Sequence, residues 1–284
     1  MEIAYTGSKG THLGWQHDIN QENPAFGCAT KGGKTTCNRP YAFYNAIDFF
    51  NFNAYSHYNA GTVTLRKRFD HGLLFRINFT YGKSLDIASG LNYAGAGGYK
   101  GAQDSQHPYA EYGRSDSDRK FVLNGNFVYV LPFHRNIFVK GWQTAGSVQA
   151  ATGTPFTPQL NGPNGDDGLA TRPNRVCGGE LAHPTVNMWF DTSCFPQSPV
   201  VIGVFGNSGR NILTGPKLVV INASISRNFC ITEKQKLQFR WEIFNVPNHP
   251  NFNTPNDYLD VANVGTITTA KDPRVMQLGA KYQF

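Results

Sequence analysis

Apolar and polar side chains alternate along this chain over stretches that are long for β-strands. In residues 73–84 one face carries Leu73, Phe75, Ile77, Phe79 and Tyr81, and the other carries Arg76, Asn78, Thr80 and Ser84. Successive side chains of a strand point to opposite faces, so this period predicts a strand with one apolar face. The same period recurs in residues 2–6, 62–69, 121–131, 138–150, 219–229, 237–243 and 275–284. We therefore expect eight strands, the longest near the 9–11 residues that a tilted strand needs to cross a bilayer.

The connections between these strands alternate between short and long. Residues 70–72, 132–136 and 230–235 form short connections. Residues 7–56, 86–118, 152–215 and 247–274 form long ones that are rich in Gly, Asn, Pro, Asp and Ser. Compact soluble domains rarely carry four loops of this length. Short turns at one rim and long loops at the other are typical of outer-membrane barrels. The sequence thus predicts an all-β fold, an antiparallel transmembrane β-barrel with short periplasmic turns and long extracellular loops.

Composition supports a membrane location and argues against several other classes. Charged residues make up 16% of the chain, against about 25% in a typical soluble domain. No run of 18 apolar residues occurs, which excludes a membrane-spanning helix. The formal charge is +7, but strand faces that carry Phe, Leu and Ile leave little basic surface for nucleic acid.

No enzymatic motif stands out. The chain has no G-x-S-x-G, and GNSGRN at residues 206–211 lacks the GK[ST] ending of a phosphate-binding loop. We expect neither catalytic residues nor a cofactor. No C-x-x-C or H-x-x-x-H spacing indicates zinc, and we expect no metal site. NGPNGDD at residues 161–167 offers oxygen ligands but not the spacing of an EF-hand, so calcium remains a weaker alternative.

The five cysteines suggest two local disulfides. Cys28 and Cys37 bracket one polar loop, Cys177 and Cys194 bracket another, and Cys230 is left over. Two such pairs predict an oxidising compartment. The alternative is five unrelated thiols.

Four arginines fall on the polar face of their strands, near the short turns: Arg66, Arg68, Arg76 and Arg240. We place them in the periplasmic half of the barrel lumen. They could form an electropositive path for an anionic ligand. We favour a structural role, in which they pair with carboxylates of a plug domain or with neighbours such as Glu242, because buried charges need partners.

The long loops carry aromatic and amide side chains that suit saccharides or peptides. They are Tyr93, Tyr99, Tyr109, Tyr112, Asn161, Asn164, Trp189, Phe195 and Tyr258. The same residues could instead pack on one another and close the mouth of the barrel. Both interpretations stay open.

The alternation continues to the last residue, in VMQLGAKYQF. If the last strand runs toward the periplasm, Tyr282 and Phe284 lie in the aromatic girdle of that rim. An ordinary strand that happens to end the sequence is the alternative. The N-terminal residues show no charged segment followed by an apolar one, so we expect the chain to lack its own beginning.

Seven strings, in this order, resemble the C-terminal barrel of TonB-dependent receptors, in particular Oar-like receptors with a carboxypeptidase-regulatory-like N-terminal domain. They are LRKRFDHGLLFRINFTYGKSLD (65–86), SDSDRKFVLNGNFVYVLPF (115–133), GWQTAGSVQAATGTPFTP (141–158), WFDTSCF (189–195), GNSGRNILTGP (206–216), LQFRWEIFNVPNHPNFNTP (237–255) and DPRVMQLGAKYQF (272–284). The resemblance implies that residues 1–284 are a partial receptor barrel domain. They would form the last eight strands of a 22-stranded barrel, and the signal peptide, plug and N-terminal domain would be absent from this sequence.

The resemblance also implies a function and partners. The function would be ligand binding at the cell outer membrane and energised uptake. The partners would be membrane lipid, the TonB complex acting through the absent plug, an unidentified ligand, and the barrel assembly machinery, which would read Leu278, Tyr282 and Phe284. A non-transporting structural or adhesive barrel that displays its loops is the alternative function. A closed eight-stranded barrel is the alternative architecture.

Overall fold

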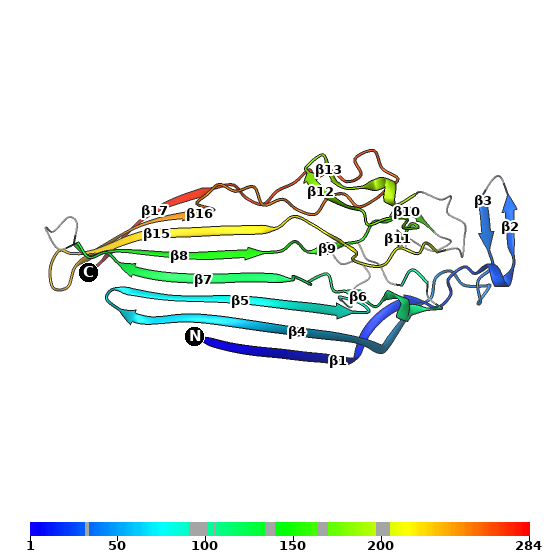
Figure 1. Cartoon of the computed structure of the whole chain (residues 1–284), viewed down its shortest axis with the longest axis horizontal. Helices are drawn as coiled ribbons and strands as arrows, with labels where there is room; N and C mark the ends of the chain where they lie inside the picture. The colour runs from blue at the N-terminus through cyan, green and yellow to red at the C-terminus, as the bar shows by residue number, and fades with distance from the viewer. Residues whose placement is uncertain (32–33, 91–101, 105, 134–139, 164–169, 197–204) are drawn as a thin grey trace.

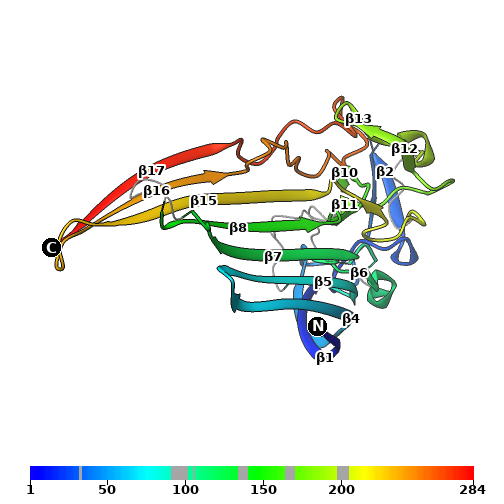
Figure 2. The same cartoon turned by 60° about the vertical axis from the view of Figure 1, so that its left-hand side comes forward.

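Eight long antiparallel strands form one twisted sheet, and each strand lies beside its neighbour in sequence (Figures 1 and 2). The computed structural model describes residues 1–284 except 32–33, 91–101, 105, 134–139, 164–169 and 197–204. The strands are β1 (Glu2–Asp18), β4 (Asp48–Asp70), β5 (Leu73–Asp86), β7 (Phe121–Val130), β8 (Trp142–Ala151), β15 (Leu218–Cys230), β16 (Lys236–Phe244) and β17 (Val275–Gln283). A short strand, β6 (Gly113–Arg114), pairs with the end of β5. Each of the eight predicted strands is therefore present.

The remaining elements are short and gather at the end of the sheet where the long connections lie (Figure 1). Three hairpins pair β2 (Cys28–Lys31) with β3 (Lys34–Cys37), β10 (Leu160–Pro163) with β11 (Ala170–Thr171), and β12 (Glu180–Thr185) with β13 (Met188–Phe190). A fourth two-stranded sheet joins distant segments, β9 (Pro155–Phe156) and β14 (Leu213–Thr214). The 3₁₀ helices are η1 (Pro24–Phe26), η2 (Pro108–Glu111) and η3 (Thr192–Cys194). In the described part of the chain, no helix is long and apolar enough to cross a membrane.

The first long connection is shorter than the sequence predicts. We expected a loop over residues 7–56, but β1 continues to Asp18 and β4 begins at Asp48. The two strands stay paired from Glu2↔Thr64 to Asp18↔Asp48, with register shifts around Leu13. The alternation is weak here because this part of the hairpin lies beyond the apolar band, where lipid no longer requires every position of one face to be apolar. The predicted strand 138–150 begins at Trp142 in the structure, and its first residues fall in the segment outside the described residues.

The outermost strands, β1 and β17, do not pair with each other within the described residues. The sheet is therefore open, and it shows neither a closed eight-stranded barrel nor a count of 22 strands.

One face of the sheet is apolar and exposed. The register aligns Ile77, Val148 and Ile221 across adjacent strands, with Gly125 between the first two. Large apolar side chains on this face remain open to the surroundings, among them Phe79 at 40% and Leu278 at 69% exposure. On β15 the apolar positions run from Val219 to Phe229, which is about 33 Å along the strand. Tilted by about 40°, that length covers the roughly 25 Å apolar band of an outer-membrane barrel.

Aromatic side chains border this band at both ends. Tyr81 and Phe121 pack with their ring centroids 5.3 Å apart on the side of the long loops. On the side of the short turns, Trp142 packs edge-on against Phe229 at 6.4 Å and against Phe239 at 6.1 Å. The guanidinium of Arg227 lies 4.1 Å from the centre of the Phe229 ring. Such girdles mark the two membrane interfaces of a β-barrel.

Candidate functional site

The second face of the sheet is polar and hollowed. A hollow of about 430 Å³ lies over β5, β7, β8 and β15. Its lining is dominated by polar side chains, namely Arg76, Asn78, Asn124, Asn126, Ser147, Gln149 and Asn222. These residues meet because the register aligns Asn78 with Asn124 and Ser147 with both Asn126 and Asn222. The alternation that supplies an apolar face thus also supplies a polar concave one.

Hydrogen bonds between neighbouring strands hold part of this lining in place. Asn78 Oδ1 accepts from Thr64 Oγ1 at 2.9 Å and from Arg76 Nε at 3.2 Å. Asn222 Nδ2 donates to Ser147 Oγ at 3.3 Å. Amides in such an arrangement present both donors and acceptors, which suits hydroxyl and peptide groups of a polar ligand.

The four arginines lie where the sequence places them along their strands. Arg66 and Arg76 are direct register partners on the polar face. Arg240 Nη1 lies 3.4 Å from Glu242 Oε1; the Arg240 side chain is exposed and that of Glu242 is half-buried. This is the neighbour contact that the structural interpretation named, and contact with a plug stays a prediction for Arg66, Arg68, Arg76, Arg240 and Glu242.

The C-terminal residues lie on the apolar face at the rim of the short turns (Figure 1). Leu278 is the register partner of Trp241, and Tyr282 that of Leu237. The rings of Tyr282 and Phe284 stack at 6.0 Å, and Phe284 is 94% exposed. Their recognition by an assembly machinery stays a prediction.

The long connections pack on one another at the opposite end of the sheet, and we call the described parts of residues 19–47, 87–120, 152–217 and 245–274 the loop cap. Its larger apolar cluster contains Phe156, Leu160, Phe190, Cys194, Phe195, Leu213 and Leu259. A smaller cluster joins Trp15 and Ala54 of the β1–β4 hairpin to Ile87 and Ala102. The loops therefore have a core of their own.

Buried ion pairs tie distant parts of the loop cap together. Arg172 donates through Nη1 to Glu111 Oε2 at 2.6 Å and through Nη2 to Glu111 Oε1 at 3.0 Å, and both side chains are almost fully buried. Arg210, 1% exposed, forms an ion pair with Asp86 and donates through Nε to the Glu111 carbonyl oxygen at 3.1 Å. Paired, hydrogen-bonded geometry of this kind compensates the cost of burying a charge.

Sequence reasoning missed these pairs. Glu111 is 61 residues from Arg172, and Asp86 is 124 residues from Arg210. No local pattern marks a contact at such a separation, because each residue alone reads as an ordinary charged loop position.

The loop aromatics divide between packing and exposure. Phe195 is 1% exposed in the larger cluster, and Trp189 packs against that cluster while its Nε1 donates to the Thr214 carbonyl oxygen at 2.9 Å. Tyr258 is partly buried in the same region. Tyr109 and Tyr112 are exposed and pack around Tyr55 instead. Tyr93, Tyr99 and Asn164 lie outside the described residues, and Asn161 lies in β10.

Two disulfides join the cysteines that the spacing pairs. Cys28–Cys37 closes the β2–β3 hairpin, and Cys177–Cys194 joins the loop before β12 to η3. Cys230 is free and exposed at the end of β15. Both disulfides thus lie at the end of the sheet where the long loops gather.

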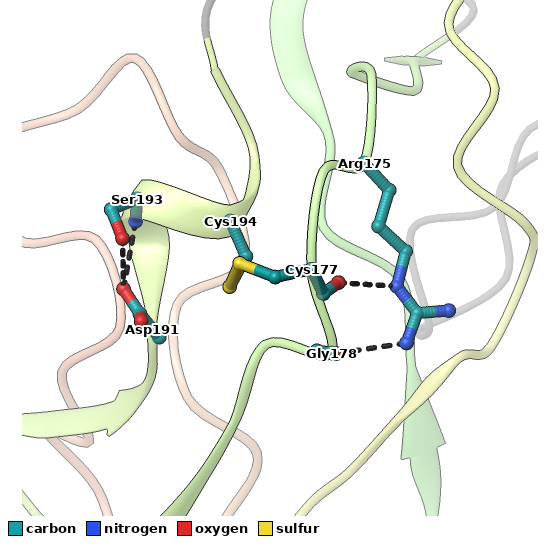
Figure 3. The surroundings of a disulfide bond; sticks show 6 residues. All are labelled: Arg175, Cys177, Gly178, Asp191, Ser193 and Cys194. Atoms are coloured by element: carbon teal, nitrogen blue, oxygen red, sulfur yellow. Dashed lines mark hydrogen bonds between the residues drawn. A yellow bond between two sulfur atoms is a disulfide. The ribbon is translucent and has the colours of Figure 1, made fainter.

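The Cys177–Cys194 disulfide has a polar setting (Figure 3). Asp191 Oδ1 accepts from the Ser193 backbone N–H at 3.0 Å and from Ser193 Oγ at 2.6 Å, which caps η3. The ligand atoms of Cys177, Asp191 and Cys194 lie within 4.8 Å of one another. Both sulfurs are bonded to each other and offer no thiolate, so this cluster has a structural role. The proposed calcium segment, 161–167, lies largely outside the described residues.

Burial shifts the titration of two groups in and near the loop cap. Burial raises the pKa of Asp257 to about 6, although Gln159 Nε2 donates to its carboxylate at 3.2 Å. Burial also lowers the pKa of His17, and this effect outweighs the attraction of the neighbouring Asp18.

A comparison with protein families decides the wider identity. A family model described as an outer membrane beta barrel domain matches residues 1–277. The chain belongs to this outer membrane β-barrel domain family. No curated protein matches the chain.

Membership fixes the location of this outer membrane β-barrel domain and the environment of its faces. The domain lies in the cell outer membrane, so the apolar face contacts lipid. The polar concave face then points to the barrel interior, and the loop cap lies beyond one interface.

Proposed function

We propose that this domain forms part of the wall and the extracellular lid of a TonB-dependent receptor. In this proposal further strands complete the barrel, a plug domain fills its lumen, and TonB supplies the energy for uptake. The barrel assembly machinery inserts the protein through its C-terminal strand. Seven strings that resemble Oar-like receptors, in order along the chain, support this assignment.

The observation that carries the proposal is the polar hollow on the face turned away from lipid. Its amide and hydroxyl groups come from four adjacent strands and lie at the middle of the sheet. Amides suit a saccharide or peptide ligand that exchanges hydrogen bonds as it moves.

A second candidate is a structural or adhesive barrel that transports nothing. The packing of the loop cap favours it, because two apolar clusters, buried ion pairs and disulfides hold the loops as a firm display surface. The two candidates differ in whether the lumen changes its accessibility when TonB is energised.

Cysteine labelling in cells separates the candidates. In a Cys230→Ser background of the complete gene product, Ser147→Cys places a thiol on the polar face and Val148→Cys places one on the apolar face. A membrane-impermeant maleimide is added to cells with and without an active TonB complex. We expect label at position 147 that rises with active TonB, and no label at position 148.

Equal labelling of position 147 with and without TonB would support the non-transporting barrel. Labelling at position 148 but not at 147 would refute the assignment of the two faces.

A further inference from the structure

A basic patch lies on the outward face directly beyond the aromatic row at the loop side of the membrane. Tyr5 of β1, Tyr81 of β5 and Phe121 of β7 form that row, and Gly61 of β4 lies in register between Tyr5 and Tyr81. Past the row, the outward positions change from apolar to Lys9, His57, Asn59 and Lys83. Lys9 is the register partner of His57, and Lys83 is the register partner of Asn59. We call these four residues the outward patch.

The outward patch is at the height of the lipid headgroups. Lys83 is two residues beyond Tyr81, and Lys9 is four residues beyond Tyr5. At about 3.3 Å per residue these steps are about 7 Å and 13 Å along tilted strands, hence roughly 5–10 Å above the apolar band. The headgroup region of a bilayer is of that thickness.

The charge of the patch is positive. Both lysines are exposed. Among the described residues, no ion pair joins Lys9 or Lys83 to a carboxylate. The outward positions of the three strands in this region, from Tyr5 to Lys9, Tyr55 to Gly61 and Tyr81 to Leu85, include no Asp or Glu.

An aromatic surface adjoins the patch on the side away from the membrane. Tyr55, on the same face of β4 as His57, packs against Tyr109 at 6.5 Å and against Tyr112 at 5.1 Å between ring centroids. His57 Nδ1 lies 3.0 Å from Tyr112 Oη, and Asn53 Nδ2 donates to Tyr109 Oη at 2.8 Å. These contacts fix the rings, yet Tyr109 is 51% exposed and Tyr112 37%. Fixed, exposed rings beside hydrogen-bonding groups suit the face of a sugar.

We propose that the outward patch binds the phosphorylated saccharide headgroup of an outer-leaflet glycolipid. Lys9 and Lys83 contact the phosphate oxygens of the headgroup. Asn59 and His57, which lie on β4 between the two lysines, hydrogen-bond to the headgroup. The rings of Tyr109 and Tyr112 pack on the sugar. Charge complementarity and the height of the lysines favour a lipid over a soluble ligand or a protein partner. The proposal goes beyond the proposed uptake and does not depend on it, because it concerns the outside of the barrel wall.

Native mass spectrometry of the purified full-length protein in detergent tests this binding. The probes are a bis-phosphorylated disaccharide glycolipid and the same glycolipid after removal of its phosphates. We expect the phosphorylated probe to bind at least about tenfold more tightly. The Lys9→Gln/Lys83→Gln variant should lose about 30-fold in affinity for it, since a lysine beside an anionic lipid surface contributes about fivefold.

Matched variants separate charge from shape. Lys9→Arg/Lys83→Arg should keep the affinity, and Lys234→Gln, on the short turn between β15 and β16, should leave it unchanged. Tyr109→Ala should weaken both probes alike, by about tenfold. Glutamine at exposed positions should leave the sheet intact. The circular dichroism spectrum of each variant is measured first to verify that its β-sheet signal is unchanged.

Equal affinity for the two probes, or unchanged affinity in the lysine double variant, would overturn the proposal. A change of oligomeric mass in that variant, without a change in glycolipid binding, would show instead that the patch joins two copies of the chain. If a variant fails to fold, the affinity of the wild-type protein for the phosphorylated probe is measured at increasing salt concentration instead. Affinity that does not fall with salt contradicts phosphate contacts.

Discussion

Replacing Glu111 with glutamine tests whether buried ion pairs hold the loop cap together. Glutamine keeps the shape of the side chain and an oxygen that can accept from the Gln103 backbone N–H, which lies 2.9 Å from Glu111 Oε1. It removes the negative charge that faces Arg172, whose side chain is 5% exposed. Breaking a buried pair in this way costs about 3–5 kcal/mol. We expect the loop cap to open about a hundredfold to a few thousandfold more often.

Hydrogen exchange measured by mass spectrometry reports this opening segment by segment. Peptides covering residues 102–118, 170–176 and 206–214 should exchange faster by that factor, because their amides are protected only while the cap is closed. Peptides from β7 and β15 should keep their protection, since the ion pair does not contact the membrane-spanning part of those strands.

Two matched variants sharpen the test. Arg240→Gln breaks the exposed Arg240–Glu242 contact, where the side chains are 51% and 28% exposed, and should cost no more than about 1 kcal/mol. Adding Arg172→Gln to Glu111→Gln should recover part of the protection, because the guanidinium no longer lacks its carboxylate. Unchanged exchange of the cap peptides in Glu111→Gln, or equal loss of protection in the strands, would refute the reasoning.

Three further predictions concern the loop cap. Gly153→Ala should destabilise it by about 1–3 kcal/mol or more, because a Cβ there would lie 1.8 Å from the Gly215 carbonyl oxygen. Gly178→Ala should be neutral, because a Cβ there would have nothing within 4 Å. The two variants are compared by the resistance of the loop cap to protease. Asp257, with its folded pKa raised to about 6 above its unfolded value of 3.8, should make the cap less stable as pH rises from about 4 to 6, by about 1–2 kcal/mol after allowance for partial exposure. Asp257→Asn should remove this pH dependence from the hydrogen exchange of residues 252–260, and an unchanged slope would contradict it. Cys194→Ser should cost about 3 kcal/mol, because the disulfide closes a 17-residue separation, and should speed tryptic cleavage at Arg175; cleavage no faster than in the wild type would count against a stabilising role.

The sequence predicts the membrane-spanning strands well because lipid enforces a strict rule. The side chains that face the middle of the lipid must be mostly apolar, so Leu73 to Tyr81 shows its strand without help from the rest of the chain. Beyond the lipid that rule lapses, and the paired region from Gly7 to Asp18 was therefore expected to be a loop. The turn at residues 70–72 is equally clear, because the sequence Asp-His-Gly stands between two alternating stretches. In the structure His71 and Gly72 have the positive φ angles of a tight turn.

The loop cap could not be predicted to the same extent. Its aromatic residues allowed two interpretations, and only the structure shows Phe195 buried while Tyr109 is exposed. The ion pairs that link Glu111 to Arg172 and Asp86 to Arg210 depend on how connections 87–120 and 152–217 meet each other and the end of β5 in space. The two disulfides could be predicted from the sequence, because the two cysteines of each pair lie close together along the chain.

The short separation of these cysteines bears on the order of events during biogenesis. Cys28 and Cys37 are 9 residues apart, and Cys177 and Cys194 are 17 apart. Closing loops of this size needs little chain entropy and no long-range contact. Both bonds can therefore form in a chain that has not yet paired any strand. Oxidation of these cysteines therefore does not require prior membrane insertion, because neither bond depends on a contact that the barrel strands supply.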